Sequence, residues 1–356
     1  MRAARLYAAR DLRVEEIEQP QPGPGEALIR IHACGVCPSD VRGYTGARHG
    51  AGAGLPRTPG HEWAGIIEEL GRPLEEAAAG PSVRVDESQG AAPLRVGDRV
   101  VADWRYVCGR CYQCRRGVFN YCENLRRAVR GGFAQYGVAP LSQLRRVPDN
   151  VSFEEASFTE PLACILNAHS GTRIDMGDDV VIVGAGPIGL LHMQVARHRG
   201  GRVIVSDPLA ARLEMAKQLG AHDAIDASST ASPVERVKEL TEGRGADCVI
   251  VAVGAAEPIG QALQMGAING RVNLFAGTYP PVDLPTDPNL IHYRQLVVTG
   301  SHDFIPHHFT TALKLIQYRI VRVEPLISHR FGLEDVKEAF ETTANRRGLK
   351  SMVLTA

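Results

Sequence analysis

Four cysteines stand close together near the end of the first third of the chain. They follow the spacing Cys108-x2-Cys111-x2-Cys114-x7-Cys122. Four thiolates at such short spacing can close tetrahedrally around one zinc ion and leave no open coordination position. Disulfides and an iron–sulfur cluster are the alternatives, but the spacing is not that of a ferredoxin and cytosolic chains rarely hold disulfides. The cluster therefore predicts a structural zinc site in a cytoplasmic protein.

A second group of residues has the chemistry of a catalytic metal site, which needs about three protein ligands and one open position. Cys37 is the thiolate candidate, His61 is the imidazole, and Glu62 and Glu160 are the carboxylate candidates. An adjacent His-Glu pair is by itself more often a solvated surface pair. The remaining motifs of the chain must decide whether this pair binds a metal.

A glycine-rich turn follows an apolar run. Val180–Val183 continues into Gly184-Ala185-Gly186-Pro187-Ile188-Gly189 and then into an apolar helical segment. This context is typical of a dinucleotide-binding turn, in which the helix N-terminus faces the pyrophosphate. Asp207 lies 18 residues after Gly189, where a carboxylate accepts hydrogen bonds from the adenosine ribose. A carboxylate there repels a 2′-phosphate, which favours NAD over NADP, and we expect Arg212 to line the adenine side.

Strands and helices alternate in the second half of the chain. Strands are predicted at 180–183, 202–206, 246–252, 271–276 and 296–299, with helices such as 209–219 and 233–241 between them. This alternation is typical of an α/β fold with a doubly wound parallel sheet. The earlier part of the chain reads as β-rich, with strands predicted at 27–33, 63–70 and 96–102. Ser152 and Glu155 have the spacing of a capping box and predict a helix start.

The length of 356 residues suggests about two domains. Lys+Arg and Asp+Glu both number 40, so net charge gives no reason to expect binding to nucleic acid or to an anionic membrane. No apolar run reaches about 18 residues, and no signal peptide is evident. Residues 71–95 are polar and rich in Ala, Pro and Gly, which favours an exposed loop.

Taken together, these motifs resemble those of zinc-dependent medium-chain dehydrogenases of the alcohol, sorbitol and threonine dehydrogenase type. The resemblance covers nearly the whole chain except the 71–95 loop. It implies a GroES-like β-rich catalytic domain built from residues 1–156 and 297–356, with a structural-zinc lobe at about 105–125. It also implies a Rossmann NAD-binding domain at 157–296.

The resemblance also implies roles for the candidate metal residues. Cys37, His61 and Glu62 would ligate the catalytic zinc, giving two zinc ions per subunit. Glu160 would either ligate as well or hold a water at the metal. Asp40 would accept the second ring N–H of the histidine and fix its tautomer.

The residues expected to bind substrate match the family less closely than the residues expected to bind metal. Ser39 matches the hydroxyl of the family that hydrogen-bonds the alcohol oxygen. Members often carry a histidine and a tyrosine where this chain has Arg42 and Gly43, so Arg42 could instead meet a polar or anionic group. His302 and Asp303 follow the last predicted strand of the nucleotide domain, where polyol members bring a polar residue to the substrate.

The activity implied is NAD-dependent oxidation of a secondary alcohol on a polyol, sugar or cyclitol. L-Threonine 3-dehydrogenase and a phosphorylated-polyol dehydrogenase remain alternatives, as does a nucleotide-binding member without activity. Val253, Phe275 and Ala276 are further expected cofactor contacts. A homodimer or homotetramer is expected, joined through the sheet edge near Leu274–Tyr279.

Overall fold

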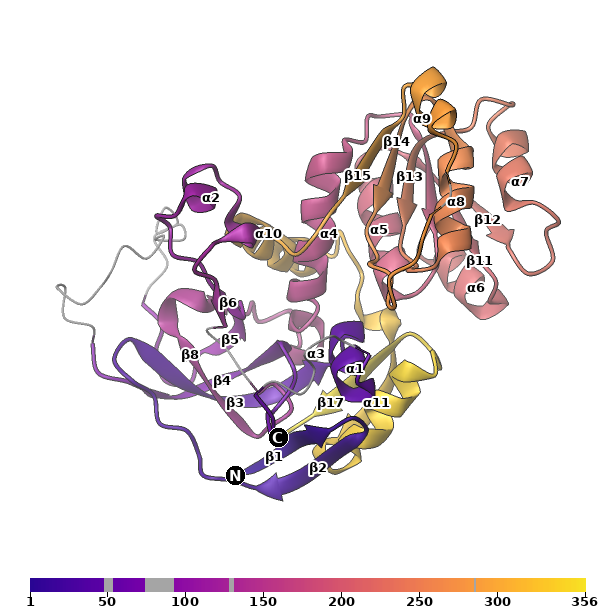
Figure 1. Cartoon of the computed structure of the whole chain (residues 1–356). Coiled ribbons are helices and arrows are strands. Elements are labelled where there is room, and N and C mark those ends of the chain that lie inside the picture. The colour runs from indigo at the N-terminus through magenta and orange to yellow at the C-terminus, as the bar shows by residue number, and fades with distance from the viewer. Residues whose placement is uncertain (48–53, 74–92, 128–130, 285) are drawn as a thin grey trace. The chain divides into compact units, whose positions relative to one another are not determined.

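A computed structural model describes residues 1–47, 54–73, 93–127, 131–284 and 286–356 (Figure 1). The chain forms two compact units. The first contains Met1–Ala163, Phe304–Tyr318 and Val323–Ala356, and the second contains Cys164–Asp303 and Arg319–Arg322. The limits predicted from the sequence, 156 and 297, lie several residues earlier in both cases. Most of the 71–95 stretch lies outside the described residues, so the expected loop there stays a prediction.

The first unit is built on a mostly antiparallel sheet of seven strands. Their order is β16-β17-β3-β4-β5-β9, and β8 pairs with β3. The strands are β3 (Glu26–Gly35), β4 (Glu62–Leu70), β5 (Arg99–Ala102), β8 (Tyr136–Pro140), β9 (Leu144–Arg146), β16 (Ile327–Gly332) and β17 (Lys350–Leu354). The last two come from the chain's C-terminal part, so both ends of the sequence build this sheet.

Smaller elements complete the first unit. The hairpin β1 (Arg2–Ala8) and β2 (Asp11–Glu16) and the short pair β6 (Arg105–Tyr106) and β7 (Arg126–Arg127) are separate two-stranded sheets. Helices of this unit are α1 (Pro38–Thr45), α2 (Tyr112–Arg115), α3 (Phe153–Ala156), α10 (Pro306–Gln317) and α11 (Val336–Ala344). Ser152 and Glu155 form the predicted capping box at the start of α3, with reciprocal hydrogen bonds of 2.8 and 3.1 Å.

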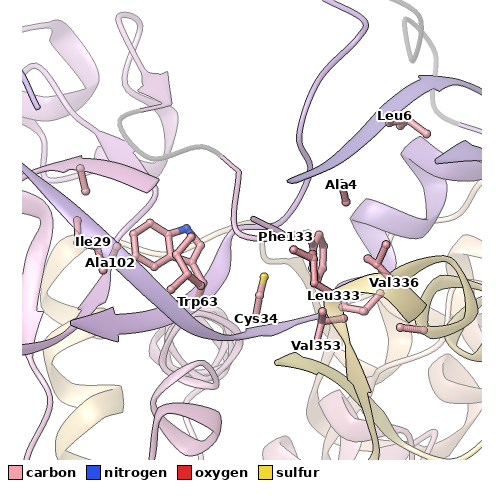
Figure 2. Close-up of a cluster of buried hydrophobic side chains, with 14 of the residues drawn as sticks. Ala4, Leu6, Ile29, Cys34, Trp63, Ala102, Phe133, Leu333, Val336 and Val353 are labelled. Atoms are coloured by element: carbon pink, nitrogen blue, oxygen red, sulfur yellow. The ribbon is translucent and has the colours of Figure 1, made fainter. Parts of the chain in front are cut away.

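The core of the first unit packs large side chains from distant parts of the sequence. Trp63 of β4, Phe133 and Phe340 of α11 are each 0% exposed. Cys34, at the end of β3, belongs to the same cluster of buried side chains (Figure 2). Burial raises the pKa of the Cys34 thiol well above its usual value, so this thiol is a packing residue.

The second unit contains a six-stranded parallel sheet with the order β12-β11-β10-β13-β14-β15. The strands are β10 (Asp179–Val183), β11 (Arg202–Asp207), β12 (Asp223–Asp226), β13 (Ala246–Val251), β14 (Gly266–Leu274) and β15 (Val297–Gly300), and the helices are α5 (Pro187–His198), α6 (Ala210–Gln218), α7 (Pro233–Leu240), α8 (Ala256–Met265) and α9 (Pro288–Arg294). This confirms the predicted α/β fold. Helix α4 (Thr159–Thr172) begins in the first unit and ends in the second.

The edge of the parallel sheet does not lie at the predicted position near Leu274–Tyr279. Leu274 ends β14, which pairs with β13 on one side and β15 on the other. The edge strand on this side of the sheet is therefore β15, because the chain returns to the sheet once more after 274–279. Within the described residues, no helix is long and apolar enough to cross a membrane.

Candidate active site

The four cysteines between 108 and 122 converge in the first unit. Their Sγ atoms all lie within 4.8 Å of one another. The backbone N–H of Cys111 donates to Cys108 Sγ at 3.4 Å, and that of Cys108 donates to Cys122 Sγ at 3.3 Å. Sulfurs bound tetrahedrally at about 2.3 Å would lie about 3.8 Å apart. The donor set and its spacing therefore fit a closed zinc site.

Backbone hydrogen bonds and burial act in opposite directions on these thiols. The backbone N–H of Arg110, with help from that of Cys111, lowers the pKa of Cys108 to about 6. Burial raises the pKa of Cys114 to about 12. The backbone thus favours the thiolate form of Cys108, while the buried Cys114 gains most from a cation that replaces its proton.

The second candidate metal group also converges in the first unit. One ligand atom each from Cys37, His61 and Glu62 lies within 4.8 Å of the others. Cys37 is the N-cap of α1, and its N–H donates to Asp40 Oδ2 at 3.3 Å. His61 directly precedes β4, and Glu62 is the first residue of that strand. Thiolate, imidazole and carboxylate are all ordinary zinc ligands, so this donor set fits a zinc ion.

Asp40 holds the imidazole of His61 in one orientation. Asp40 Oδ1 lies 3.5 Å from His61 Nδ1 and accepts from the Gly60 N–H at 3.3 Å. Burial acts to raise the pKa of Asp40, but His61 outweighs it and the pKa is lowered. Burial acts to lower the pKa of His61, whereas Asp40 and Cys37 raise it well above its usual value. With Nδ1 facing a carboxylate, Nε2 is left to face a metal.

Glu160 lies on the other side of the imidazole. Its Oε1 is 4.0 Å from His61 Nε2 and accepts from the indole N–H of Trp104 at 3.1 Å. The Trp104 and His61 rings meet edge to face, with centroids 6.1 Å apart. The sequence analysis did not select Trp104, which belongs to no motif and reaches Glu160 only through the fold.

Lys350 is a second residue that the sequence analysis missed. It begins β17, is 5% exposed and forms an ion pair with Glu62 Oε2. Burial acts to lower the pKa of Lys350, but Glu62 and Cys37 outweigh it and the pKa is raised. One oxygen of the Glu62 carboxylate therefore faces a cation of the protein itself. The available signal was a lysine at the start of a C-terminal strand whose last three residues are apolar.

The expected substrate contacts are divided between the two units. The Ser39 hydroxyl donates to Cys37 Sγ at 3.2 Å, which places it at the metal group. Arg42 is half-buried on α1, in the same unit. His302 and Asp303 belong to the second unit, where their carbonyls accept from the Asn167 amide at 3.2 and 2.9 Å. A role for these residues in binding substrate stays a prediction.

The glycine-rich turn joins β10 to α5 in the second unit. Gly184 has a φ of 99°, in the left-handed region that favours glycine. A side chain at Gly189 would collide with the Gly184 carbonyl oxygen, so this position also requires glycine. Gly186 is the N-cap of α5 and Pro187 its first residue. The free N–H groups at this helix start can bind a pyrophosphate.

Asp207 ends β11 beside the glycine turn. It is buried, its Oδ2 accepts from the Ala185 N–H at 2.7 Å, and its Oδ1 accepts from the Leu209 N–H at 2.9 Å. Arg212 Nη1 lies 3.9 Å from Asp207 Oδ2. The two residues expected at the adenosine side are thus neighbours, and each carboxylate oxygen keeps a lone pair for a ribose hydroxyl.

The remaining expected cofactor contacts follow the neighbouring strands. Val253 comes after β13, and its Cγ1 would lie 2.9 Å from a Cβ at Gly184. Phe275 and Ala276 follow β14, and both donate their N–H to the Val251 carbonyl. These positions lie at the carboxyl ends of parallel strands, where nucleotides bind in open α/β sheets. Their contact with a cofactor stays a prediction.

Comparison with known proteins places both units in one family. Residues 23–149 match the alcohol dehydrogenase GroES-like domain, and residues 187–318 match the zinc-binding dehydrogenase family. A sorbitol dehydrogenase of Halalkalibacterium halodurans is 33% identical, over 96% of this chain and 94% of that protein. An L-threonine 3-dehydrogenase of Pyrococcus horikoshii is also 33% identical, over 92% and 90% of the two chains.

A solved structure extends the similarity to the whole chain. A Sinorhizobium meliloti 1021 protein assigned to the zinc-binding dehydrogenases, solved with NADP, superposes with a TM-score of 0.88. It is 29% identical, and the match covers 99% of both chains. The chain therefore belongs to the zinc-binding medium-chain dehydrogenases and is an enzyme of the NAD(P)-dependent alcohol dehydrogenase type, with a GroES-like domain and a Rossmann-like domain.

Proposed function

We propose that this enzyme uses a catalytic zinc and NAD to oxidise a secondary alcohol of a polyol, sugar or cyclitol to a ketone. The observation that carries the proposal is the convergence of Cys37, His61 and Glu62, with Asp40 fixing the imidazole. Sorbitol and threonine, after which two of the relatives are named, both carry a secondary alcohol. This shared group supports a secondary alcohol as the reacting centre.

We assign the following roles to the residues of the metal group. Cys37, His61 and Glu62 would hold the zinc, which when bound supplies a Lewis acid that lowers the pKa of the alcohol. Asp40 keeps the histidine proton on Nδ1. The Ser39 hydroxyl, 3.2 Å from Cys37 Sγ, is placed to turn toward the substrate and accept a hydrogen bond from the O–H of the alcohol. NAD supplies the hydride acceptor.

Zinc content and turnover test the ligand assignment. We expect two zinc ions per chain, and we expect Glu62→Gln to reduce the number to one and to abolish turnover. Glu160→Gln tests whether the second carboxylate ligates as well or only positions a water. If Glu62→Gln leaves both zinc content and turnover unchanged, Glu62 is not a ligand. Zinc is measured by elemental analysis of the purified variants.

A substrate panel tests the activity itself. We expect reduction of NAD with at least one polyol, sugar or cyclitol, loss of activity on chelation, and recovery when zinc is returned. Threonine belongs in the panel because a 33% identical relative is an L-threonine 3-dehydrogenase. A metal-free preparation with full activity would contradict the proposal.

NAD rather than NADP is proposed as the cofactor because of the buried Asp207 carboxylate. The same panel run with both cofactors tests this point. We expect Asp207→Ser to increase the use of NADP relative to NAD, since it removes the charge that repels a 2′-phosphate. An unchanged preference would show that Asp207 does not set it.

We further propose a homodimer or homotetramer in the cytoplasm. In the part of the chain that the structure describes, no strand pairs with the outer side of the edge strand β15, and its Val297 and Val298 are 51% and 38% exposed. Tyr293, just before that strand, is 77% exposed. None of the eight cysteines, all of which lie in the described part of the chain, forms a disulfide, which is typical of a compartment that keeps thiols reduced.

A further inference from the structure

Arg57 is a basic residue that lies four positions before His61 and was not selected from the sequence. Its N–H donates to the Leu6 carbonyl at 3.1 Å, and its carbonyl accepts from the Leu6 N–H at 2.8 Å. Three residues later, Gly60 donates its N–H to Asp40 Oδ1. Hydrogen bonds thus hold both ends of the segment 57–60, which leads directly into His61 of the metal group.

The Arg57 guanidinium lies against α1 where that helix has no side chain. A Cβ placed on Gly43 would lie 2.7 Å from Arg57 Nη2. Glycine is the least favourable residue after proline inside a helix, so local helix propensity does not explain it at this position. The guanidinium occupies the space that a side chain at position 43 would take.

Position 43 lies on the same face of α1 as Ser39. Residues four apart lie on one face of a helix, separated by about 6 Å along its axis. Gly43 is four residues after Ser39, whose hydroxyl is 3.2 Å from Cys37 Sγ. The Arg57 guanidinium is therefore about one helical turn from the hydroxyl proposed to contact the reacting alcohol, a span that a chain of several carbon atoms covers.

The charge of Arg57 is not balanced within the described part of the chain. Among those residues it takes part in no ion pair and no side-chain hydrogen bond. Two carboxylates of the metal group are engaged elsewhere, Asp40 by His61 and Glu62 by Lys350. A half-buried guanidinium that no described carboxylate neutralises is available to bind an anionic group of a ligand.

We infer that Arg57 binds an anionic group of the substrate, a carboxylate or a phosphate, several atoms away from the reacting alcohol. The inference rests on the proposed function and narrows its substrate class from neutral polyols to acidic derivatives such as aldonates and polyol phosphates. The planar fork of N–H groups on arginine matches both anions in a paired arrangement.

Three six-carbon compounds test the inference, namely sorbitol, gluconate and sorbitol 6-phosphate. We expect the zinc-loaded wild-type enzyme to have a higher kcat/KM for at least one of the two anions than for sorbitol. Which anion is preferred distinguishes carboxylate from phosphate. Arg57→Gln is expected to lower kcat/KM for that anion about 10- to 100-fold, chiefly through KM, and to change the value for sorbitol less than about twofold.

Two further variants separate binding from folding. Gly43→Ala keeps Arg57 but pushes its guanidinium away, because the new Cβ would lie 2.7 Å from Nη2. It is expected to weaken use of the anion while the helix stays intact. Arg347→Gln removes an exposed arginine of the same unit and is expected to change nothing.

Calorimetric titration of the wild type and Arg57→Gln with gluconate and sorbitol 6-phosphate gives a readout that needs no turnover. Weaker anion binding in the variant supports the inference even if none of the three compounds is oxidised, an outcome that would count against the proposed function alone. A preference of the wild type for sorbitol, or an equal loss for sorbitol and the anions in Arg57→Gln, would overturn the inference and leave the proposed function standing.

Discussion

Lys350 and Glu62 form a buried ion pair at the candidate catalytic site, with side chains 6% and 1% exposed. Removing one partner of such a pair leaves an uncompensated buried charge, which typically costs about 3–5 kcal/mol. We therefore predict that Lys350→Met lowers the free energy of unfolding of the metal-free protein by about that amount. Urea denaturation in the presence of a chelator measures it.

The matched control for this prediction is Lys337→Met. Lys337 is exposed on α11 of the same unit, so its removal should change the free energy of unfolding by less than about 0.5 kcal/mol. Similar values for the two variants would show that the lysine at 350 is not needed to balance Glu62. Adding zinc to Lys350→Met should recover more stability than in the wild type, because the metal then compensates the carboxylate.

At the residue scale, the sequence predicted side chains that belong to motifs and missed those that do not. Cys37, His61 and Glu62 were selected from their type and neighbours, and the fold brings their ligand atoms together. Lys350 contacts Glu62 across 288 positions of the chain. Trp104 contacts Glu160 in the same way. Such contacts depend on strand pairing, and no local pattern of residues encodes them.

Among the elements, the segment that carries the four-cysteine cluster depends most on metal. Helix α2 has four residues, and β6 and β7 have two each, too few to be stable alone. We predict that Cys114→Ser removes one zinc ion per chain and makes residues 105–125 sensitive to proteolysis. Elemental analysis and limited proteolysis measure this, with the buried Cys248→Ser as the control. Equal zinc content in the two variants would contradict it.

Helices α4 and α5 pack through two buried histidines of the second unit. His169 Nε2 and His192 Nδ1 are 3.1 Å apart, and the other ring nitrogen of each has no hydrogen-bond partner among the described residues. Burial lowers the pKa of His192 to about 3 and that of His169 well below its usual value. Both rings are therefore neutral in the folded protein, whereas they would bind protons in the unfolded chain below about pH 6.5.

The sign of the resulting pH dependence follows from proton binding. Between about pH 6.5 and pH 3 the unfolded chain holds more protons, so stability falls as the pH falls, by up to about 1.4 kcal/mol per pH unit for each ring. We predict that His192→Gln roughly halves the part of the slope that the two rings contribute below pH 6.5. Denaturant unfolding at pH 7, 6 and 5 measures it. The exposed His307→Gln should keep the wild-type slope.

The predicted elements were accurate where a segment is long and strongly patterned. The strands at 180–183 and 202–206 correspond to β10 and β11. Strand β12 was missed because its four residues, Asp223–Asp226, bury only Ile225 and show no period. Strand β14 begins at Gly266, five residues earlier than predicted, with an irregularity between Ala246 and Cys248 in its pairing with β13. Pairing of this kind cannot be inferred from one strand alone.

At the scale of the whole molecule, the exposed edge of the parallel sheet should determine assembly. If copies associate through β15, a charge at Val297 will face the partner chain and oppose pairing. We predict that Val297→Lys shifts the protein to a smaller species, measured by sedimentation velocity or light scattering. Val282→Lys, at another exposed valine of the second unit, is the comparison. A wild-type protein that is already monomeric would exclude the proposed assembly.

The close approach of Arg57 to Gly43 has an evolutionary consequence. A Cβ at position 43 and the arginine head group at position 57 would occupy the same volume. Positions 43 and 57 therefore cannot mutate independently. Lineages with a side chain at the first site should carry a shorter or differently directed residue at the second, and arginine at the second should accompany glycine at the first. Pairwise residue counts across an alignment of homologues would reveal this covariation, and with it the branch of the family that shares the substrate preference of this enzyme.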